Sequence, residues 1–371
     1  MKKTRYMSII AIVLCLLFML IACVGSPANE AKVPAAGMSG ANISSESPEP
    51  PEPKVLELTD PAESEEQEQP DYLYYPIEII TFNFEGEEVI TVYERAPQRV
   101  LAVYQGSIET MIALGLEDHV IASFGLDNEI KEEWQEGFSR MNYIDTSFAP
   151  DRETVIMLQP DLILTWGSLF NETRLGDVDY WHSRGTNTYI NTNTRRGGTR
   201  VLENEFNDLL NIGRIFNVEY RAEALVAQMR EDIKTARAAV EAQDERPLVA
   251  VITVRENDIR NYGMELAGDI ITSIGLDTVK SETNAMGKED IVVANPDVIF
   301  LEYMPRLDLD ADALRLEILS TIYDNPAFAN INAVLNGRVY TIMLGEIFAP
   351  AARTGDGIRT IVNGLFPGLL D

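Results

Sequence analysis

The chain has 371 residues, enough for about two domains of ordinary size, and 46% of them are apolar, enough for a buried core. Its formal net charge of −29 argues against a nucleic-acid-binding protein, because nucleic-acid phosphates require a basic face. The same charge is compatible with a soluble, exported protein.

Residues 1–22 have the pattern of a secretory signal peptide. A basic start at residues 2–5 is followed by an apolar run at 7–21, and Cys23 comes directly after. This ending resembles the bacterial lipobox, in which the cysteine is lipidated and becomes the first residue of the mature protein. The alternative is an uncleaved transmembrane anchor, but the apolar run is short for a full span.

Residues 23–72 are predicted to be the lipidated Cys23 followed by a disordered tether. The segment is rich in Pro, Glu, Ser and Ala, so it cannot bury enough apolar surface to offset the entropy lost on ordering. Prolines and self-repelling carboxylates are expected to keep it extended. The only other cysteine, Cys15, lies in the signal peptide, so no disulfide is expected in the mature protein.

Residues 73–213 are predicted to form an N-terminal lobe that begins with a β-hairpin. Two β-rich runs flank a turn at Gly86, which is typical of such a hairpin. Strands then alternate with helices, a pattern that indicates a parallel sheet with right-handed crossovers. The expected strands of the alternating part are 100–104, 120–123, 162–166 and 188–191.

The second half of the chain repeats this order, which predicts a C-terminal lobe at 247–371. The segment between the halves, 214–246, is predicted to be one interlobe helix, because apolar residues recur there at three- and four-residue steps. At 1.5 Å per residue, the unbroken part of this pattern would be roughly 39 Å long. A helix of that length can cross both lobes and limit hinge motion between them.

One motif occurs in both halves. Glu153 and Glu289 each begin a short helical run, and seven positions later each run ends at a Pro-Asp pair followed by apolar residues. Proline ends the helix because it lacks an N–H and restricts the residue before it. The apolar run that follows is predicted to be a buried parallel strand.

These features together resemble the substrate-binding lipoproteins of ABC importers for ferric siderophores, haem and cobalamin. The resemblance covers about residues 73–371. It rests on the lipobox and on segments 99–103, 109–115, 153–164, 210–224, 289–300 and 333–340, with Arg353. It implies an α/β fold of two Rossmann-like lobes with parallel-rich sheets, joined by one long helix, with a ligand cleft between the lobes.

The resemblance also implies what the protein binds. The expected ligand is an Fe(III)-siderophore complex, with no intrinsic cofactor and no enzymatic activity. The expected partners are a dimer of permease subunits and a cytoplasmic ATPase. A monomer is expected, lipid-anchored on the outer face of the cytoplasmic membrane. In this family one glutamate on each lobe docks onto arginines of the permease, and Glu153 and Glu289 match those glutamates by position.

Two like surfaces that each carry a carboxylate suit a pseudo-symmetric pair of basic partners. The alternative is that Glu153 and Glu289 only complement the dipoles of their helices.

Ligand-binding residues are expected on loops at the carboxyl ends of strands. Aromatic rings and guanidinium groups suit a planar or anionic iron chelate, through stacking and charge-assisted hydrogen bonds. The alternatives are core packing for each aromatic residue and a surface salt bridge for each arginine. The candidates are Tyr104, Gln105, Ser107, Trp166, Ser168, Arg195, Arg196, Tyr262, Tyr303 and Arg353.

Other functions are weighed against this one. His119 and His182, the only histidines, are not at metal-ligand spacing, which argues against a direct zinc or manganese site. Haem binding, with His182, Met264 or a tyrosine as the axial ligand, and cobalamin binding stay open. The sequence has no Gly-x-Ser-x-Gly elbow, Gly-rich phosphate loop or cysteine nucleophile, which argues against an enzyme. A lipid-anchored scaffold is the remaining alternative.

Overall fold

The structure, a computed structural model, describes residues 74–255, 258–281, 283–305 and 310–370. The predicted signal peptide (1–22), the lipidated Cys23 and the tether (23–72) lie outside the described residues. Across the residues that are described, no helix is long and apolar enough to cross a membrane.

The first described strands form the predicted β-hairpin. Strand β1 (Ile77–Phe82) pairs antiparallel with β2 (Glu88–Tyr93), and Gly86 in the turn has a φ of +86°. That positive φ suits glycine, which has no Cβ to clash. The hairpin lies against strand β6 (Asn187–Ile190), where the Thr81 hydroxyl accepts a backbone N–H at 3.2 Å.

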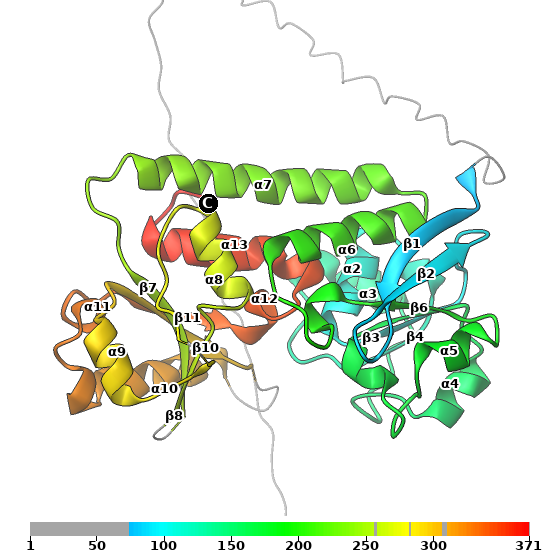
Figure 1. Ribbon diagram of the computed structural model, residues 1–371, viewed down its shortest axis with the longest axis horizontal. Helices are drawn as coiled ribbons and strands as arrows, with labels where there is room; N and C mark the ends of the chain where they lie inside the picture. Colours follow the sequence, from blue (N-terminus) through cyan, green and yellow to red (C-terminus); the bar gives the residue numbers. More distant parts are fainter. Residues whose placement is uncertain (1–73, 256–257, 282, 306–309, 371) are drawn as a thin grey trace, which may run out of the picture. The chain divides into compact units, whose positions relative to one another are not determined.

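The N-terminal lobe is an α/β unit built on one parallel sheet. Its remaining elements are β3 (Val100–Val103), α2 (Gln105–Ala113), β4 (Val120–Phe124), α3 (Gln135–Arg140), α4 (Arg152–Leu158), β5 (Leu162–Thr165), α5 (Val178–His182) and α6 (Leu202–Ile215). The strand order is β4-β3-β5-β6. Strands β3 and β5 are buried throughout because helices cover both faces of the sheet (Figure 1). Since β3 lies between its two successors, the loops after these strands meet at one crevice, the usual ligand position in such sheets.

The C-terminal lobe has a mixed sheet in the order β11-β10-β7-β8-β9. Its elements are β7 (Val249–Arg255), β8 (Asp258–Asn261), α8 (Leu266–Ser273), β9 (Ala285–Met286), α9 (Lys288–Ala294), β10 (Val298–Tyr303), α10 (Ala311–Tyr323), α11 (Asn332–Leu335), β11 (Val339–Met343), α12 (Leu344–Ile347) and α13 (Thr354–Leu365). The neighbours β11, β10 and β7 are parallel, whereas β8 and β9 are antiparallel. The prediction of two α/β lobes with parallel-rich sheets is therefore confirmed, with an antiparallel edge that the sequence did not predict.

The long helix between the lobes is α7 (Glu219–Glu241), which is shorter than the predicted segment 214–246. Its 23 residues span roughly 34 Å at 1.5 Å per residue. The predicted start was wrong because α6 ends at Ile215 and the chain turns at Asn217, which has a φ of +56°. The apolar periodicity runs through this turn, so periodicity alone does not reveal it.

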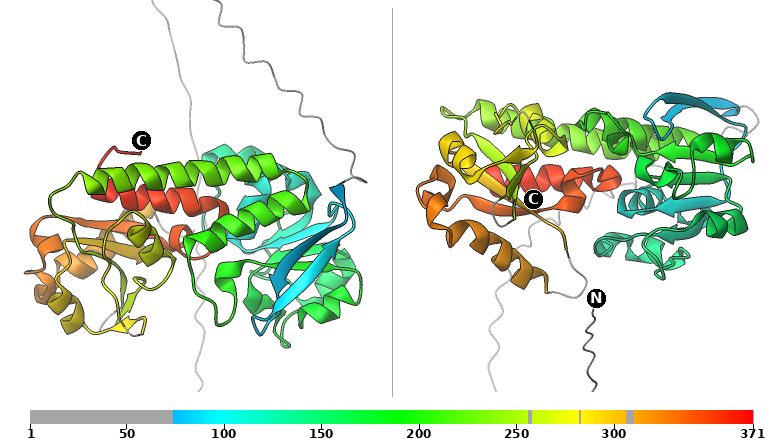
Figure 2. Two further views of the ribbon diagram at one scale, coloured as in Figure 1. Left: turned by 45° about the horizontal axis from the view of Figure 1, so that its top comes forward. Right: turned by 60° about the horizontal axis from the view of Figure 1, so that its bottom comes forward.

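A shared apolar layer joins the two lobes. Helix α7 packs on α6 from the first half of the chain and on α13 from the second half, and Figures 1 and 2 show these neighbours from three directions. Phe206 of α6, Met229 of α7 and Ile358 of α13 belong to one buried cluster. Fully burying each such side chain contributes about 1.5–3 kcal/mol, so this layer resists a change in the lobe arrangement.

Candidate functional site

The two glutamate motifs have the same local geometry. Glu153 in α4 and Glu289 in α9 each occupy the second helical position, and both side chains are exposed. Each helix ends at a residue in the left-handed conformation, Gln159 with φ +50° and Asn295 with φ +45°, directly before the proline. The repeat in the sequence is therefore a repeat in backbone structure.

The aspartates of the two Pro-Asp pairs hold the sheets in register. The Asp161 carboxylate accepts the N–H groups of Gln98 and Arg99, each at 2.8 Å. In the other lobe the Asp297 carboxylate accepts the Leu248 N–H at 2.9 Å. Each aspartate thereby ties the start of its own strand to the start of the neighbouring strand, which is a structural role.

Each glutamate lies beside two exposed apolar side chains. Ile156 and Met157, three and four residues after Glu153, are 45% and 76% exposed and complete what we call the α4 patch. The α9 patch consists of Glu289 with Val292 and Val293, which are 38% and 83% exposed. Residues at these spacings share one helix face, and exposed apolar groups of this kind are common at interaction surfaces.

A cavity of about 260 Å³ lies between the lobes, and we call it the aromatic cavity. Trp166 and Phe148 line it from the N-terminal lobe, and Tyr262 and Phe348 line it from the C-terminal lobe. The Trp166 Nε1–H is buried and has no acceptor among the described residues. Since buried donors are nearly always paired, this N–H is suited to an acceptor atom of a bound ligand. The remaining lining residues are Asp127, Asn128, Arg255, Arg260, Met304, Pro305, Leu344 and Gly345.

Tyr104 supports this aromatic wall from behind. Its buried ring has its centroid 4.6 Å from that of Trp166 and 5.5 Å from that of Phe148. Tyr104 has φ +72° and ψ 156°, a region that residues other than glycine rarely adopt and that costs roughly 1–3 kcal/mol. Gly125, with φ +84°, passes so close that a Cβ would lie 2.6 Å from the Phe148 carbonyl oxygen. The unusual backbone conformations at Tyr104 and Gly125 therefore allow the rings of Tyr104, Phe148 and Trp166 to pack together.

Guanidinium groups surround the aromatic cavity although the whole chain is acidic. Arg260 forms an ion pair with Glu265 at 3.0 Å and lies 4.8 Å from the centre of the Tyr262 ring. Arg255 has no ion-pair partner among the described residues, and its side chain is exposed. Arg200 comes from the other lobe, lies 4.5 Å from the centre of the Phe348 ring and also pairs with Glu265. The cavity is suited to a ligand with aromatic or planar parts and negative charge.

One carboxyl group lines the same cavity. Burial raises the pKa of Asp127 to about 6, because its charged form loses contact with water. Its carboxylate has no hydrogen-bond partner in the part of the chain that the structure describes. Asp127 is therefore able to change its charge between pH 7 and pH 5.

A second cavity of about 350 Å³ adjoins the aromatic cavity, with which it shares Asn128 and Pro305. We call it the polar cavity because Tyr303, Arg315 and Arg353 line it. The Asn128 Oδ1 atom is buried and has no hydrogen-bond donor among the described residues. Residues that line the two cavities therefore carry one unpaired donor, Trp166 Nε1, and one unpaired acceptor, Asn128 Oδ1.

Comparisons with known proteins identify the family. Residues 100–343 match the family model described as periplasmic binding protein. The chain belongs to this family. Membership places such proteins outside the cytoplasm, and the relatives found are substrate-binding proteins.

Three relatives show how close the similarity is. The chain is 24% identical over 273 residues to the petrobactin-binding protein YclQ of Bacillus subtilis, covering 71% of this chain and 80% of the relative. A periplasmic binding protein from Veillonella parvula is 31% identical with a TM-score of 0.72, covering 79% of this chain and 92% of that one. An ABC-type Fe³⁺-hydroxamate transport protein from Saccharomonospora viridis is 21% identical with a TM-score of 0.61, covering 79% and 99%. The last similarity supports the fold alone.

Four of the ten candidate ligand residues line the cavities, and a fifth packs against the cavity wall. Trp166 and Tyr262 line the aromatic cavity, with Tyr104 behind its wall. Tyr303 and Arg353 line the polar cavity. Most of these residues follow the carboxyl end of a strand, where the sequence analysis expected ligand contacts.

The other five candidates do not line either cavity. Gln105 is buried in a hydrogen-bond network, and the Ser107 hydroxyl is buried and donates to the Asn191 side chain. Ser168 is exposed in a short 3₁₀ helix. The two remaining arginines face the hairpin: Arg195 lies 4.4 Å from the centre of the Phe82 ring, and Arg196 pairs with Glu85 at 2.6 Å.

Two of the side chains named as axial haem ligands do not line the cavities, whereas tyrosine, the third choice, is present there as Tyr262 and Tyr303. The His182 Nε2 atom is hydrogen-bonded to the Thr188 hydroxyl at 2.9 Å, and neither His182 nor Met264 lines either cavity.

Arg255, Arg260 and Phe348 line the aromatic cavity but were not among the residues predicted from the sequence. Arg260 lies in β8, where exposed and buried residues alternate around Ile259, a pattern short enough to be taken for a loop. Phe348 follows β11 by five residues, so the rule of strand ends could have found it.

Proposed function

We propose that this protein binds a ferric siderophore in the aromatic and polar cavities and delivers it to a membrane permease of an ABC importer. The observation that carries the proposal is the unpaired Trp166 N–H in an aromatic wall, with Arg255 and Arg260 at its rim. Arginines and aromatic rings are suited to an anionic, partly planar chelate. The similarity to YclQ, a petrobactin-binding protein, supports the same ligand class.

The proposed partners follow from the α4 and α9 patches. Each patch presents one carboxylate and two apolar side chains on its own lobe, so the pair suits two related basic surfaces of a permease dimer. Lipidation of Cys23 would hold the protein, as a monomer, on the outer face of the cytoplasmic membrane beside that permease, whose transport is driven by a cytoplasmic ATPase. No enzymatic step is part of this proposal.

The ligand is tested by titrating tryptophan fluorescence with ferric petrobactin, a ferric hydroxamate, haem and cobalamin. We expect saturable quenching by one class of ferric chelate, and Trp166→Phe should remove most of the signal. Trp134 and Trp181 are the only other tryptophans, and neither lines the aromatic cavity or the polar cavity. Unchanged fluorescence with all four ligands would refute the proposal. Quenching by haem or cobalamin alone would show that the ligand is that compound and not a ferric siderophore.

Removing one guanidinium from the cavity is expected to weaken binding strongly. A charge-assisted hydrogen bond contributes about 1.5–3 kcal/mol, so Arg260→Gln should lower affinity by about 10- to 150-fold. The matched control is Arg230→Gln, because Arg230 is an exposed arginine of α7 that pairs with Glu203 outside the cavities. Equal affinities of the two variants for the ligand would show that the ligand does not contact Arg260 in the aromatic cavity.

The pH dependence of binding tests the charge of the ligand. Asp127 is mostly ionised at pH 7.5 and mostly neutral at pH 5.5, because burial raises its pKa to about 6. An anionic chelate binds more tightly beside the neutral form, so affinity should rise as the pH falls through 6. The rise is about tenfold for each unit by which the ligand raises that pKa. Isothermal titration at both pH values should show the rise, and Asp127→Asn should flatten it; a fall would indicate a cationic ligand.

A further inference from the structure

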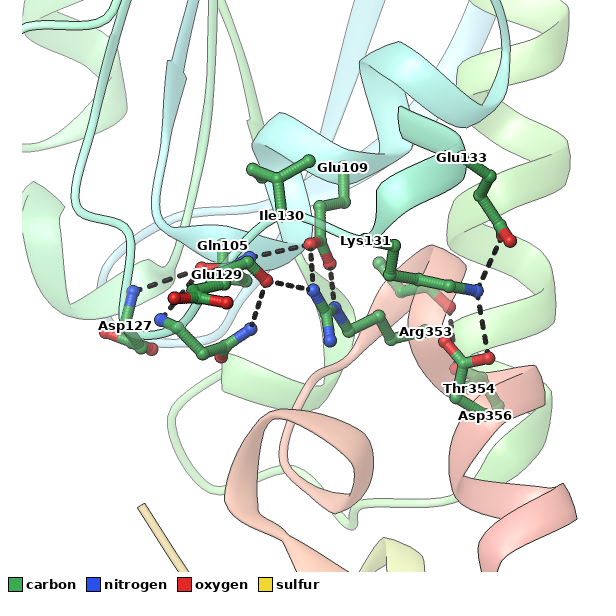
Figure 3. Close-up of polar contacts among 12 residues, drawn as sticks. Gln105, Glu109, Asp127, Glu129, Ile130, Lys131, Glu133, Arg353, Thr354 and Asp356 are labelled. Atoms are coloured by element: carbon green, nitrogen blue, oxygen red, sulfur yellow. Dashed lines mark hydrogen bonds and ion pairs between the residues drawn. The ribbon is translucent and has the colours of Figure 1, made fainter. Parts of the chain in front are cut away.

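A buried ion pair joins the two lobes beside the ligand cavities (Figure 3). Glu109 lies in α2 of the N-terminal lobe, and Arg353 ends the 3₁₀ helix η6 (Ala351–Arg353), directly before α13. The guanidinium is bidentate: Nε donates to Glu109 Oε2 at 2.5 Å and Nη2 donates to Glu109 Oε1 at 2.6 Å. The two side chains are 7% and 0% exposed, so water does not screen the pair.

The same ion pair fixes the segment 127–129, which lines both cavities. Gln105 Nε2 donates to Glu109 at 2.6 Å, and Gln105 Oε1 accepts the N–H groups of Asp127 and Asn128 at 3.0 and 3.4 Å. Arg353 Nη2 also donates to the Glu129 carbonyl at 2.6 Å. Figure 3 shows these contacts converging on the segment from α2 on one side and Arg353 on the other. Three successive residues of the cavity wall are therefore held by one network.

The Arg353 guanidinium has one nitrogen that no hydrogen bond among the described residues uses. Its hydrogen bonds use Nε and Nη2, and Nη1 has no acceptor among the described residues. Arg353 is one of the residues lining the polar cavity. A guanidinium has five donors in a planar fork, so one edge is able to hold Glu109 while the other reaches a bound ligand.

We propose that Arg353 is a positioning residue, which with Glu109 clamps the segment 127–129 between the lobes and so sets both the lobe arrangement and the shape of the ligand site. A clamp of this kind needs the planar fork, because a lysine ammonium cannot hold Glu109 through two parallel bonds while contacting the Glu129 carbonyl. The effect on affinity rests on the proposed function, but the effect on lobe arrangement does not.

A purely structural ion pair is the competing explanation, and it makes a different prediction. Such a pair would stabilise the fold without affecting how the folded lobes are arranged. Breaking it would lower the unfolding temperature and leave the width of the interlobe distance distribution unchanged in the folded protein.

The first test measures that distance without any ligand. Spin labels are attached after Met157→Cys and Val293→Cys, two highly exposed positions on opposite lobes, in the full chain carrying Cys15→Ser and Cys23→Ser. Pulsed electron resonance then gives the distance distribution. We expect Arg353→Lys to broaden it at least twofold, and an unchanged width in the folded variant would overturn the proposal. If Arg353→Lys does not fold, Glu109→Gln is measured and judged in the same way.

The matched control is Lys131→Gln. Lys131 pairs with Asp356 at 2.9 Å, so this change also breaks an ion pair between the lobes, but a partly exposed one that does not hold segment 127–129. The width should stay within experimental error of the unsubstituted chain. Equal broadening in the control and in Arg353→Lys would overturn the specific role of Arg353.

The second test measures affinity for ferric petrobactin by fluorescence at a temperature where circular dichroism shows every variant folded. We expect Arg353→Lys and Glu109→Gln to bind at least tenfold more weakly and Lys131→Gln to bind within twofold. Unchanged affinity in both clamp variants would overturn the part of the proposal that concerns the ligand site. If the unsubstituted chain does not bind ferric petrobactin, the measurement is made with the ferric chelate that quenches Trp166. If no ferric chelate binds, the proposed function fails, and the distance measurement alone decides the clamp.

Discussion

Reversing the charge of both glutamates, with Glu153→Lys and Glu289→Lys together, is expected to abolish uptake of the iron chelate and to leave its binding unchanged. Both carboxylates are exposed and have no ion-pair partner among the described residues, so their loss should not disturb the fold. Neither residue lines a ligand cavity. A lysine facing a basic partner costs several kcal/mol through like-charge repulsion, and two such contacts should prevent docking.

Uptake is measured with radiolabelled ferric chelate in cells, and affinity is measured separately on the purified variant. Each single reversal should lower uptake partly, because one lobe keeps its contact. The control is Glu231→Lys with Glu317→Lys, which makes the same change of charge at exposed positions on α7 and α10. Normal uptake by the Glu153 and Glu289 double variant would show that these residues do not contact the permease. A large loss of affinity for the chelate would show that they contribute to the fold or to the ligand site.

Local chemistry made most of the fold predictable from the sequence. The Pro-Asp pairs mark where α4 and α9 stop, since only one capping residue separates the end of each helix from the proline. The strands β3, β5 and β10 are buried throughout, as continuous apolar runs predict. The antiparallel strand β8 was missed because its four residues are mostly polar, and only pairing with β7 makes them a strand.

The ligand site was less predictable because it depends on which residues meet across the chain. The rule of strand ends places Tyr104, Trp166 and Tyr303 near the cavities. The rule does not say which side chains form ion pairs with one another. It therefore cannot distinguish Arg353, which is held by Glu109, 244 positions away, from Arg196, which pairs with Glu85 in the hairpin. Both arginines were suggested as ligand contacts because a guanidinium group suits an anionic chelate.

Removing Glu109 alone is expected to destabilise the protein more than any surface change. Glu109→Ala leaves the Arg353 guanidinium buried without its counter-charge, which costs about 3–5 kcal/mol. The Gln105 side chain would also lose its acceptor. Burial raises the pKa of Glu109 and the hydrogen bonds from Arg353 oppose that rise, so each partner depends on the other. Urea denaturation followed by circular dichroism gives the free energy of unfolding.

Replacing both partners by apolar residues should cost much less than replacing one. Glu109→Met with Arg353→Met removes both buried charges, and buried ion pairs replaced in this way are often neutral or stabilising by about 1–4 kcal/mol. We expect the double variant to be more stable than Glu109→Ala and also more stable than Arg353→Met alone. If the free energy of unfolding of the double variant instead falls by the sum of the losses in the two single variants, the two residues are not coupled. A stable double variant that binds its chelate weakly would show that the charges are kept for the geometry of segment 127–129, because stability alone would favour their replacement.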